Sequence, residues 1–106
     1  MKIEDIQMEL ERIRQENEAL VVASRATNEL FKKDFAVAER ARENQDIDTW
    51  FDYMAKCQAH LKKGELIKRM LEDCNERARK VLVTLYGPLG NELFKAIQQT
   101  VEEAPD

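Results

Sequence analysis

Residues 3–20, IEDIQMELERIRQENEAL, place apolar side chains at the alternating three- and four-residue spacing of a coiled-coil heptad. The seam positions of this repeat are, in order, Ile3, Ile6, Leu10, Ile13, Asn17 and Leu20. Asn17 falls at an a position, where a lone Asn pairs best with its own copy across a parallel dimer and fixes the register. The stretch therefore predicts a coiled-coil dimerisation segment over residues 1–20 and a parallel homodimer.

The composition of the whole chain favours long helices. Of the 106 residues, 36% are charged and 43% hydrophobic, and there are only 3 Gly and 2 Pro. Helix breakers are therefore rare, while Glu, Lys, Arg, Gln, Ala and Leu are abundant. The β-branched residues are scattered or lie within helical periodicity, so we predict an all-α fold.

The first predicted helix covers about residues 3–43 and changes character after Leu20. The strict heptad gives way there to a wider apolar stripe that includes Val22, Leu30 and Phe35. A wider stripe is typical of a helix that packs against more than one neighbour. We therefore expect residues 21–43 to form one wall of a helical bundle.

A second long helix is predicted to return antiparallel after a short polar turn at residues 44–46. Asp48 or Thr49 is the expected N-cap, and the helical phase continues across Gly64, which favours a continuous or kinked helix. The sequence Gly87-Pro88-Leu89-Gly90 predicts its end, and Asn91 is expected to cap a short third helix.

Together these elements predict an elongated antiparallel helical hairpin of two long helices with a short C-terminal third helix. The hairpin or bundle would cover residues 21–103, and residues 104–106 would form a disordered tail.

Charge and cysteine usage indicate a cytoplasmic protein. The net charge is −4, with acidic ends and a mildly basic middle, which gives no strong preference for nucleic acid. The first residues lack a signal-peptide pattern, and the longest apolar run, residues 19–23, is too short to span a bilayer. Cys57 and Cys74 are isolated, so free thiols in a reducing cytosol are expected.

Few residues are suited to catalysis or metal binding. Cys57 and His60 are spaced to share a helix face, and Cys74 would be a third zinc ligand, but no paired motif accompanies them. Both cysteines lie on apolar stripes, which favours a role as small core residues. Ser24 lies in a helix without a nucleophile elbow. We therefore expect neither an enzyme nor a bound metal or cofactor.

Three aromatic residues, Trp50, Phe51 and Tyr53, cluster at the predicted turn of the hairpin. Three rings within four residues cannot all face one core stripe, so at least one is expected near the surface. One interpretation is that they close the open end of the bundle. The other is that they bind a protein partner, because Trp and Tyr are frequent interface anchors.

Basic residues gather in the second half of the chain and are candidate nucleic-acid contacts. They are Lys62, Lys63, Lys68, Arg69, Arg77, Arg79 and Lys80. Acidic residues lie among them, as is usual for a solvated helix face.

The favoured function is a non-enzymatic homo-oligomeric interaction module, a small cytosolic adaptor or regulator that binds an unidentified protein partner. The alternatives are a helical regulator that binds nucleic acid through residues 62–80, and an acidic inhibitor that mimics nucleic acid.

Overall fold

The computed structural model describes residues 3–103, with the side chains of residues 3–98. It contains three α-helices: α1 (Ile3–Glu43), α2 (Ile47–Tyr86) and α3 (Pro88–Glu103). None of the described residues forms a strand, and the two long helices pack against each other. The predicted all-α hairpin of two long helices with a short third helix is thus confirmed. The predicted tail at 104–106 lies outside the described residues.

The contacts within the chain form two compact units, which are described separately. The hairpin unit comprises residues 18–71, and the three-helix unit comprises residues 3–17 together with residues 72–103. A separate dimerisation segment over residues 1–20 stays a prediction.

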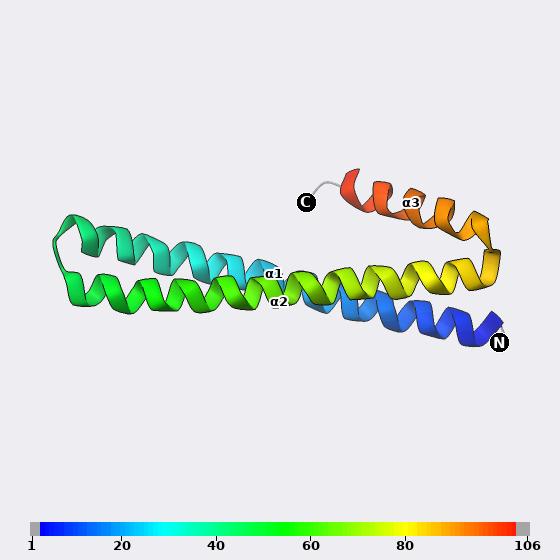
Figure 1. Cartoon of the computed structure of the whole chain (residues 1–106), viewed down its shortest axis with the longest axis horizontal. Coiled ribbons are helices and arrows are strands. Elements are labelled where there is room, and N and C mark those ends of the chain that lie inside the picture. The colour runs from blue at the N-terminus through cyan, green and yellow to red at the C-terminus, as the bar shows by residue number, and fades with distance from the viewer. Residues whose placement is uncertain (1–2, 104–106) are drawn as a thin grey trace. The chain divides into compact units, whose positions relative to one another are not determined.

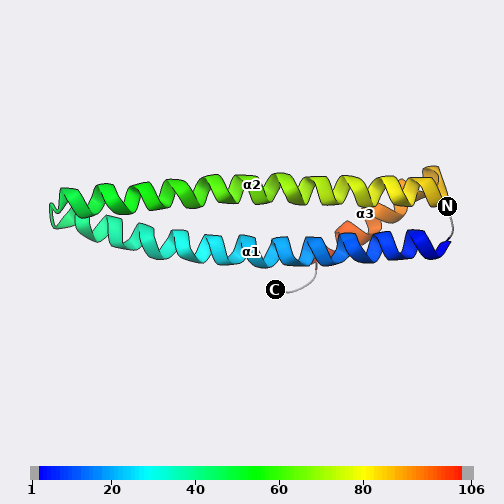
Figure 2. The same ribbon diagram turned by 90° about the horizontal axis from the view of Figure 1, so that it is seen from below.

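In the hairpin unit, α1 and α2 run antiparallel and are joined by a three-residue turn (Figures 1 and 2). The backbone N–H of Asp46 donates to the carbonyl of Ala41 at 2.8 Å, and Gln45 adopts a left-handed φ of 59°, which ends α1. The Asp46 carboxylate then accepts the N–H of Thr49 at 3.3 Å. The N-cap is therefore Asp46, and the cap predicted at Asp48 or Thr49 is wrong, because α2 begins at Ile47.

The seam of the hairpin unit keeps the seven-residue spacing that was predicted to end at Leu20. Thr27 and Ala41 are buried and Asp34 is half-buried, each seven residues from the next. Val22 and Leu30, which were expected to widen the buried stripe, are 65% and 47% exposed. Ala26 and Phe35 of the predicted stripe are exposed as well, whereas Val21, Ala23 and Phe31 are half-buried and Ala38 is buried. The predicted wider stripe is thus wrong for about half of its members, since α1 has one long neighbour in this unit.

Several of the side chains buried between the two helices are small. In the hairpin unit Ala38, Ala41 and Cys57 are buried, beside the larger Ile67. Thr27 is also buried, and its hydroxyl donates to the carbonyl of Ala23 at 2.8 Å, one turn earlier in the same helix. The buried seam of this unit thus combines small and polar residues with one large apolar side chain.

In the three-helix unit, residues 3–17 of α1 lie beside residues 72–86 of α2, and α3 turns back along α2 (Figure 1). Ile6, Ile13 and Leu82 are buried there. The corner between α2 and α3 needs a single residue, Gly87, at a left-handed φ of 62°. The expected four-residue break with Asn91 as cap is therefore wrong: Pro88, whose fixed φ suits a first helical position, already begins α3.

Two other glycines have opposite surroundings. A Cβ placed on Gly90 would lie 2.4 Å from the backbone oxygen of Leu82, so α3 approaches α2 too closely there for any side chain. Gly64 lies inside the continuous helix α2, as the phase of the sequence predicted, and a Cβ there would meet nothing within 4 Å.

No helix in the described part of the chain has an apolar stretch long enough to cross a membrane.

The different surroundings of Gly90 and Gly64 predict opposite effects on stability when one methyl group is added at each position. Gly90→Ala should lower the free energy of unfolding by about 1–3 kcal/mol, because the rigid backbone at Leu82 must move. Gly64→Ala should raise it by about 1 kcal/mol, since alanine restricts the unfolded chain and favours the helix. Urea unfolding followed by circular dichroism measures both. Equal effects of the two changes would contradict the close approach at Gly90.

Candidate functional site

The predicted dimer seam is largely covered within the single chain. Ile6 and Ile13 are 3% and 4% exposed inside the three-helix unit, and Leu10 and Asn17 are half-buried. Leu20 is half-buried as well, in the hairpin unit. Of this predicted seam, Ile3 alone is exposed. The homodimer stays a prediction, and a second copy would have to contact mainly other side chains.

A polar cluster joins α1 and α2 in the three-helix unit. Arg77 donates to the carboxylate of Glu16, and its Nε lies 3.1 Å from the carboxylate of Asp73. The thiol of Cys74 lies 3.7 Å from the same Glu16 carboxylate and 3.3 Å from the Arg77 guanidinium. The hydrogen bond from Arg77 lowers the pKa of Glu16, while burial raises the pKa of Cys74.

A second polar pair joins the helices of the hairpin unit. His60 Nε2 lies 2.8 Å from the Asp34 carboxylate, and both side chains are about four-fifths covered, at 20% and 18% exposed. Cys57, one turn before His60, is buried, and this burial raises the pKa of its thiol, with a further contribution from the Asp34 charge. Since the reactive form of cysteine is the thiolate, both buried thiols are poor nucleophiles.

The residues considered as zinc ligands do not form a metal site. Cys57 and His60 belong to the hairpin unit, whereas Cys74 belongs to the three-helix unit. Among the described residues, no three His, Cys, Asp or Glu side chains converge in a way that would hold a metal ion. The sulfur atoms of both free cysteines serve instead to fill the narrow seam.

The three aromatic residues at the hairpin turn are placed differently from one another. Trp50 and Tyr53 are half-buried, whereas Phe51 is exposed, as the spacing predicted for at least one ring. Phe51 meets Trp50 edge to face with ring centroids 4.9 Å apart, and the ammonium of Lys56 lies 4.2 Å above the Tyr53 ring. Of the three rings, that of Phe51 is thus the most accessible, and partner binding by this cluster stays a prediction.

The basic residues predicted to contact nucleic acid do not share one face of α2. Successive members lie one, two, five or eight residues apart, which distributes them over more than one face of the helix. Arg77 is paired with Glu16 and Asp73, and Arg79 with Glu76 and Asn91. The charges of the remaining members stay available to a ligand. These members are Lys62, Lys63, Lys68, Arg69 and Lys80. Nucleic-acid binding stays a prediction.

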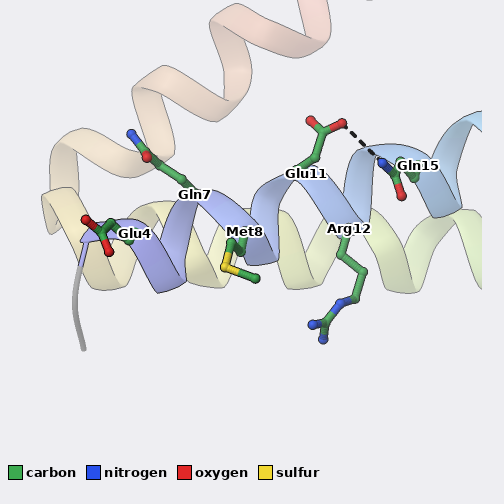
Figure 3. Close-up of a pocket in the computed structure, with 6 residues that line it drawn as sticks. All are labelled: Glu4, Gln7, Met8, Glu11, Arg12 and Gln15. Atoms are coloured by element: carbon green, nitrogen blue, oxygen red, sulfur yellow. Dashed lines mark hydrogen bonds between the residues drawn. The ribbon is translucent and has the colours of Figure 1, made fainter.

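A shallow hollow of about 490 Å³ lies over the start of α1 (Figure 3). Its lining comes from one helix alone: Glu4, Gln7, Met8, Glu11, Arg12 and Gln15. Glu11 and Gln15 are hydrogen-bonded to each other at 3.4 Å along that helix. Side chains of a single helix point outward and do not converge on a ligand, so the hollow lacks the geometry of a binding pocket.

Exposed apolar side chains are the most prominent surface feature. In the hairpin unit the large ones are Val22, Leu30, Phe35, Ile47, Phe51, Leu61, Leu66 and Met70. In the three-helix unit they are Ile3, Met8, Tyr86, Leu89, Leu93 and Ile97. Both units thus present apolar surface that α1–α3 of a single chain do not cover.

Comparisons of the chain with protein-family models, with curated proteins and with solved structures found no match.

The ion pair between α1 and α2 predicts an acid-sensitive contribution to stability. Because Arg77 lowers the pKa of Glu16 in the folded chain, this contribution is present above the ordinary glutamate pKa of 4.5 and is lost as pH falls through the lowered value. Glu16→Gln should therefore unfold at lower temperature than the wild type at pH 7. The difference should disappear in strong acid, as measured by thermal unfolding at a series of pH values.

Glu11→Gln is the matched control for this prediction. Glu11 also has a lowered pKa, but its partner is Arg14 on the same exposed face of α1. Exposed pairs within one helix contribute little to stability. If both variants showed the same pH dependence, the pairing of Glu16 across the two helices would contribute no more than a surface pair.

Proposed function

We propose that this protein is a non-enzymatic helical interaction module that forms a homodimer and acts by binding other protein surfaces. The supporting observation is the amount of large apolar side-chain surface that the single chain leaves exposed. Phe51, Leu61 and Leu66, for example, are 56–60% exposed. Contiguous exposed apolar surface is typical of an interface that is covered in the assembled state.

The chemistry of the polar groups supports binding in place of catalysis. Catalytic groups are usually gathered in a concave pocket with shifted pKa values close to the working pH. Here the shifted groups are paired carboxylates and arginines or buried thiols, and the pKa of each thiol is raised. Their arrangement orients two helices relative to each other within each unit.

The cytosol is the compartment that we propose. Cys57 and Cys74 are both free and buried, so neither depends on an oxidising environment to complete the fold. A small cytosolic adaptor or regulator is the role most consistent with a chain that has uncovered apolar surface on both units.

The homodimer is tested by the mass of the protein in solution. At micromolar concentrations, size-exclusion chromatography with light scattering should give twice the mass of one chain, because burying the exposed leucine and phenylalanine side chains favours association. Sedimentation over a range of concentrations should then give the dissociation constant. A single-chain mass throughout that range would overturn the homodimer.

A further inference from the structure

One edge of the hairpin unit can be defined from its seam. Asp34 and His60 meet across the two helices at 2.8 Å. When two antiparallel helices pack together, the residues three positions after two facing seam residues lie on one edge of the helix pair. Here these residues are Val37 and Lys63. The three-helix unit shows this relation directly, since Glu16 and Arg77, three positions after the seam residues Ile13 and Cys74, form an ion pair.

This edge, called here the basic edge, combines apolar and positively charged side chains. Outside the seam, residues three, four or seven positions from Val37 or Lys63 lie on the same edge. Among them are the exposed Leu30, Leu66 and Met70. The same spacings add four cations to the edge, Lys33, Arg40, Lys56 and Lys63, of which Lys56 lies over the Tyr53 ring. Asp52 is the one acidic residue at the corresponding positions within residues 18–71. The edge is thus apolar along its length and carries an excess of positive charge.

The cations of the basic edge differ in their ion pairing from nearby cations on other faces of the hairpin unit. Lys32 is paired with Glu29 at 3.9 Å and Arg42 with Glu39 at 3.0 Å. Within the described part of the chain, by contrast, no carboxylate lies within ion-pair distance of the four cations of the basic edge. An acidic helix with an apolar stripe would match both the charges and the leucines, whereas a phosphate backbone would match the charges only.

Helix α3 has the complementary character. It packs in its own unit through the buried Gly90 and the half-buried Phe94, and leaves Leu89, Leu93 and Ile97 exposed on successive turns. The exposed Glu92 lies beside this apolar stripe and is paired with Lys95 at 3.8 Å. By sequence, α3 contains two further glutamates and no other lysine or arginine, so the helix is acidic overall. Its exposed stripe therefore offers leucine and isoleucine side chains on a helix with an excess of negative charge.

We propose that the basic edge of the hairpin unit binds the exposed stripe of α3 from a second copy of the chain. The exchange is reciprocal: each chain contributes one α3 stripe and one basic edge, so two identical contacts close a two-fold dimer. The proposal rests on the proposed homodimer and assigns the surfaces that form it. Charge complementarity adds a salt dependence, so that higher ionic strength weakens the dimer.

Three single variants in the full-length protein test this assignment. Leu66→Glu alters the basic edge and Ile97→Glu alters the α3 stripe, both at exposed positions, while Val22→Glu at an exposed position off both surfaces is the control. Each of the first two should raise the dimer dissociation constant at least about tenfold, because a carboxylate would be placed against apolar side chains. The control should leave the constant unchanged, and circular dichroism checks that all variants keep their helix content.

Mixing the two weakened variants provides the decisive measurement. The intact α3 of the Leu66→Glu chain can bind the intact basic edge of the Ile97→Glu chain, so one of the two contacts is restored. Native mass spectrometry, with one chain isotopically labelled, should therefore detect more heterodimer than either homodimer. Pairing of like surfaces, α3 with α3 or edge with edge, would give no such recovery and would overturn the exchange.

The remaining outcomes separate this proposal from the proposed function. A wild-type protein that stays a single chain overturns both. A wild-type dimer that neither variant weakens overturns the exchange and leaves the homodimer in place. If short duplex DNA bound the wild type at low salt and displaced the second copy, and Lys63→Glu abolished that binding, the basic edge would belong to a nucleic-acid site and the exchange would be wrong.

Discussion

The narrow seam between α1 and α2 is the constraint on which the other features of this protein depend. At many seam positions both helices place small or polar residues, beside the larger Ile6, Ile13, Ile67 and Leu82. Much of the leucine, methionine and phenylalanine side-chain surface consequently lies on the edges and outer faces. The exposed apolar surface is thus a result of how the two helices pack.

Two polar contacts make this seam specific. Shifting α2 by seven residues would place Ile67 or Tyr53 opposite Asp34 and leave a half-buried carboxylate without its histidine. The pairing of Glu16 with Arg77 fixes the alignment of the three-helix unit in the same way.

The sequence predicted the extent of the long helices more accurately than their caps and their packing partners. The bounds of α1 and the continuity of α2 through Gly64 follow from apolar periodicity and the scarcity of helix breakers, which are local properties. The caps were misassigned because residues that fit the capping pattern also follow a few positions later: Asp48 lies two residues after Asp46, and Asn91 three residues after Pro88.

The seam partner was harder to predict, because a heptad specifies a neighbouring helix without indicating whether that helix belongs to the same chain. The pairing of Asp34 with His60 was missed for a related reason. Following the seven-residue repeat of α1 beyond Leu20 reaches Thr27, Asp34 and Ala41, and the polar members of that series conceal it from a search for apolar residues.

The three-residue turn between α1 and α2 has a consequence for the order in which the chain acquires structure. Asp34 and His60 are 26 residues apart in sequence, whereas Glu16 and Arg77 are 61 apart. Short loops close at the lowest entropic cost, so helix pairing starts at the turn and proceeds away from it. During synthesis on the ribosome, residues 18–71 can therefore pair before residues 72–86 have emerged. Until then Ile6 and Ile13 have no α2 segment to cover them, and a nascent chain is at that stage most susceptible to non-specific association.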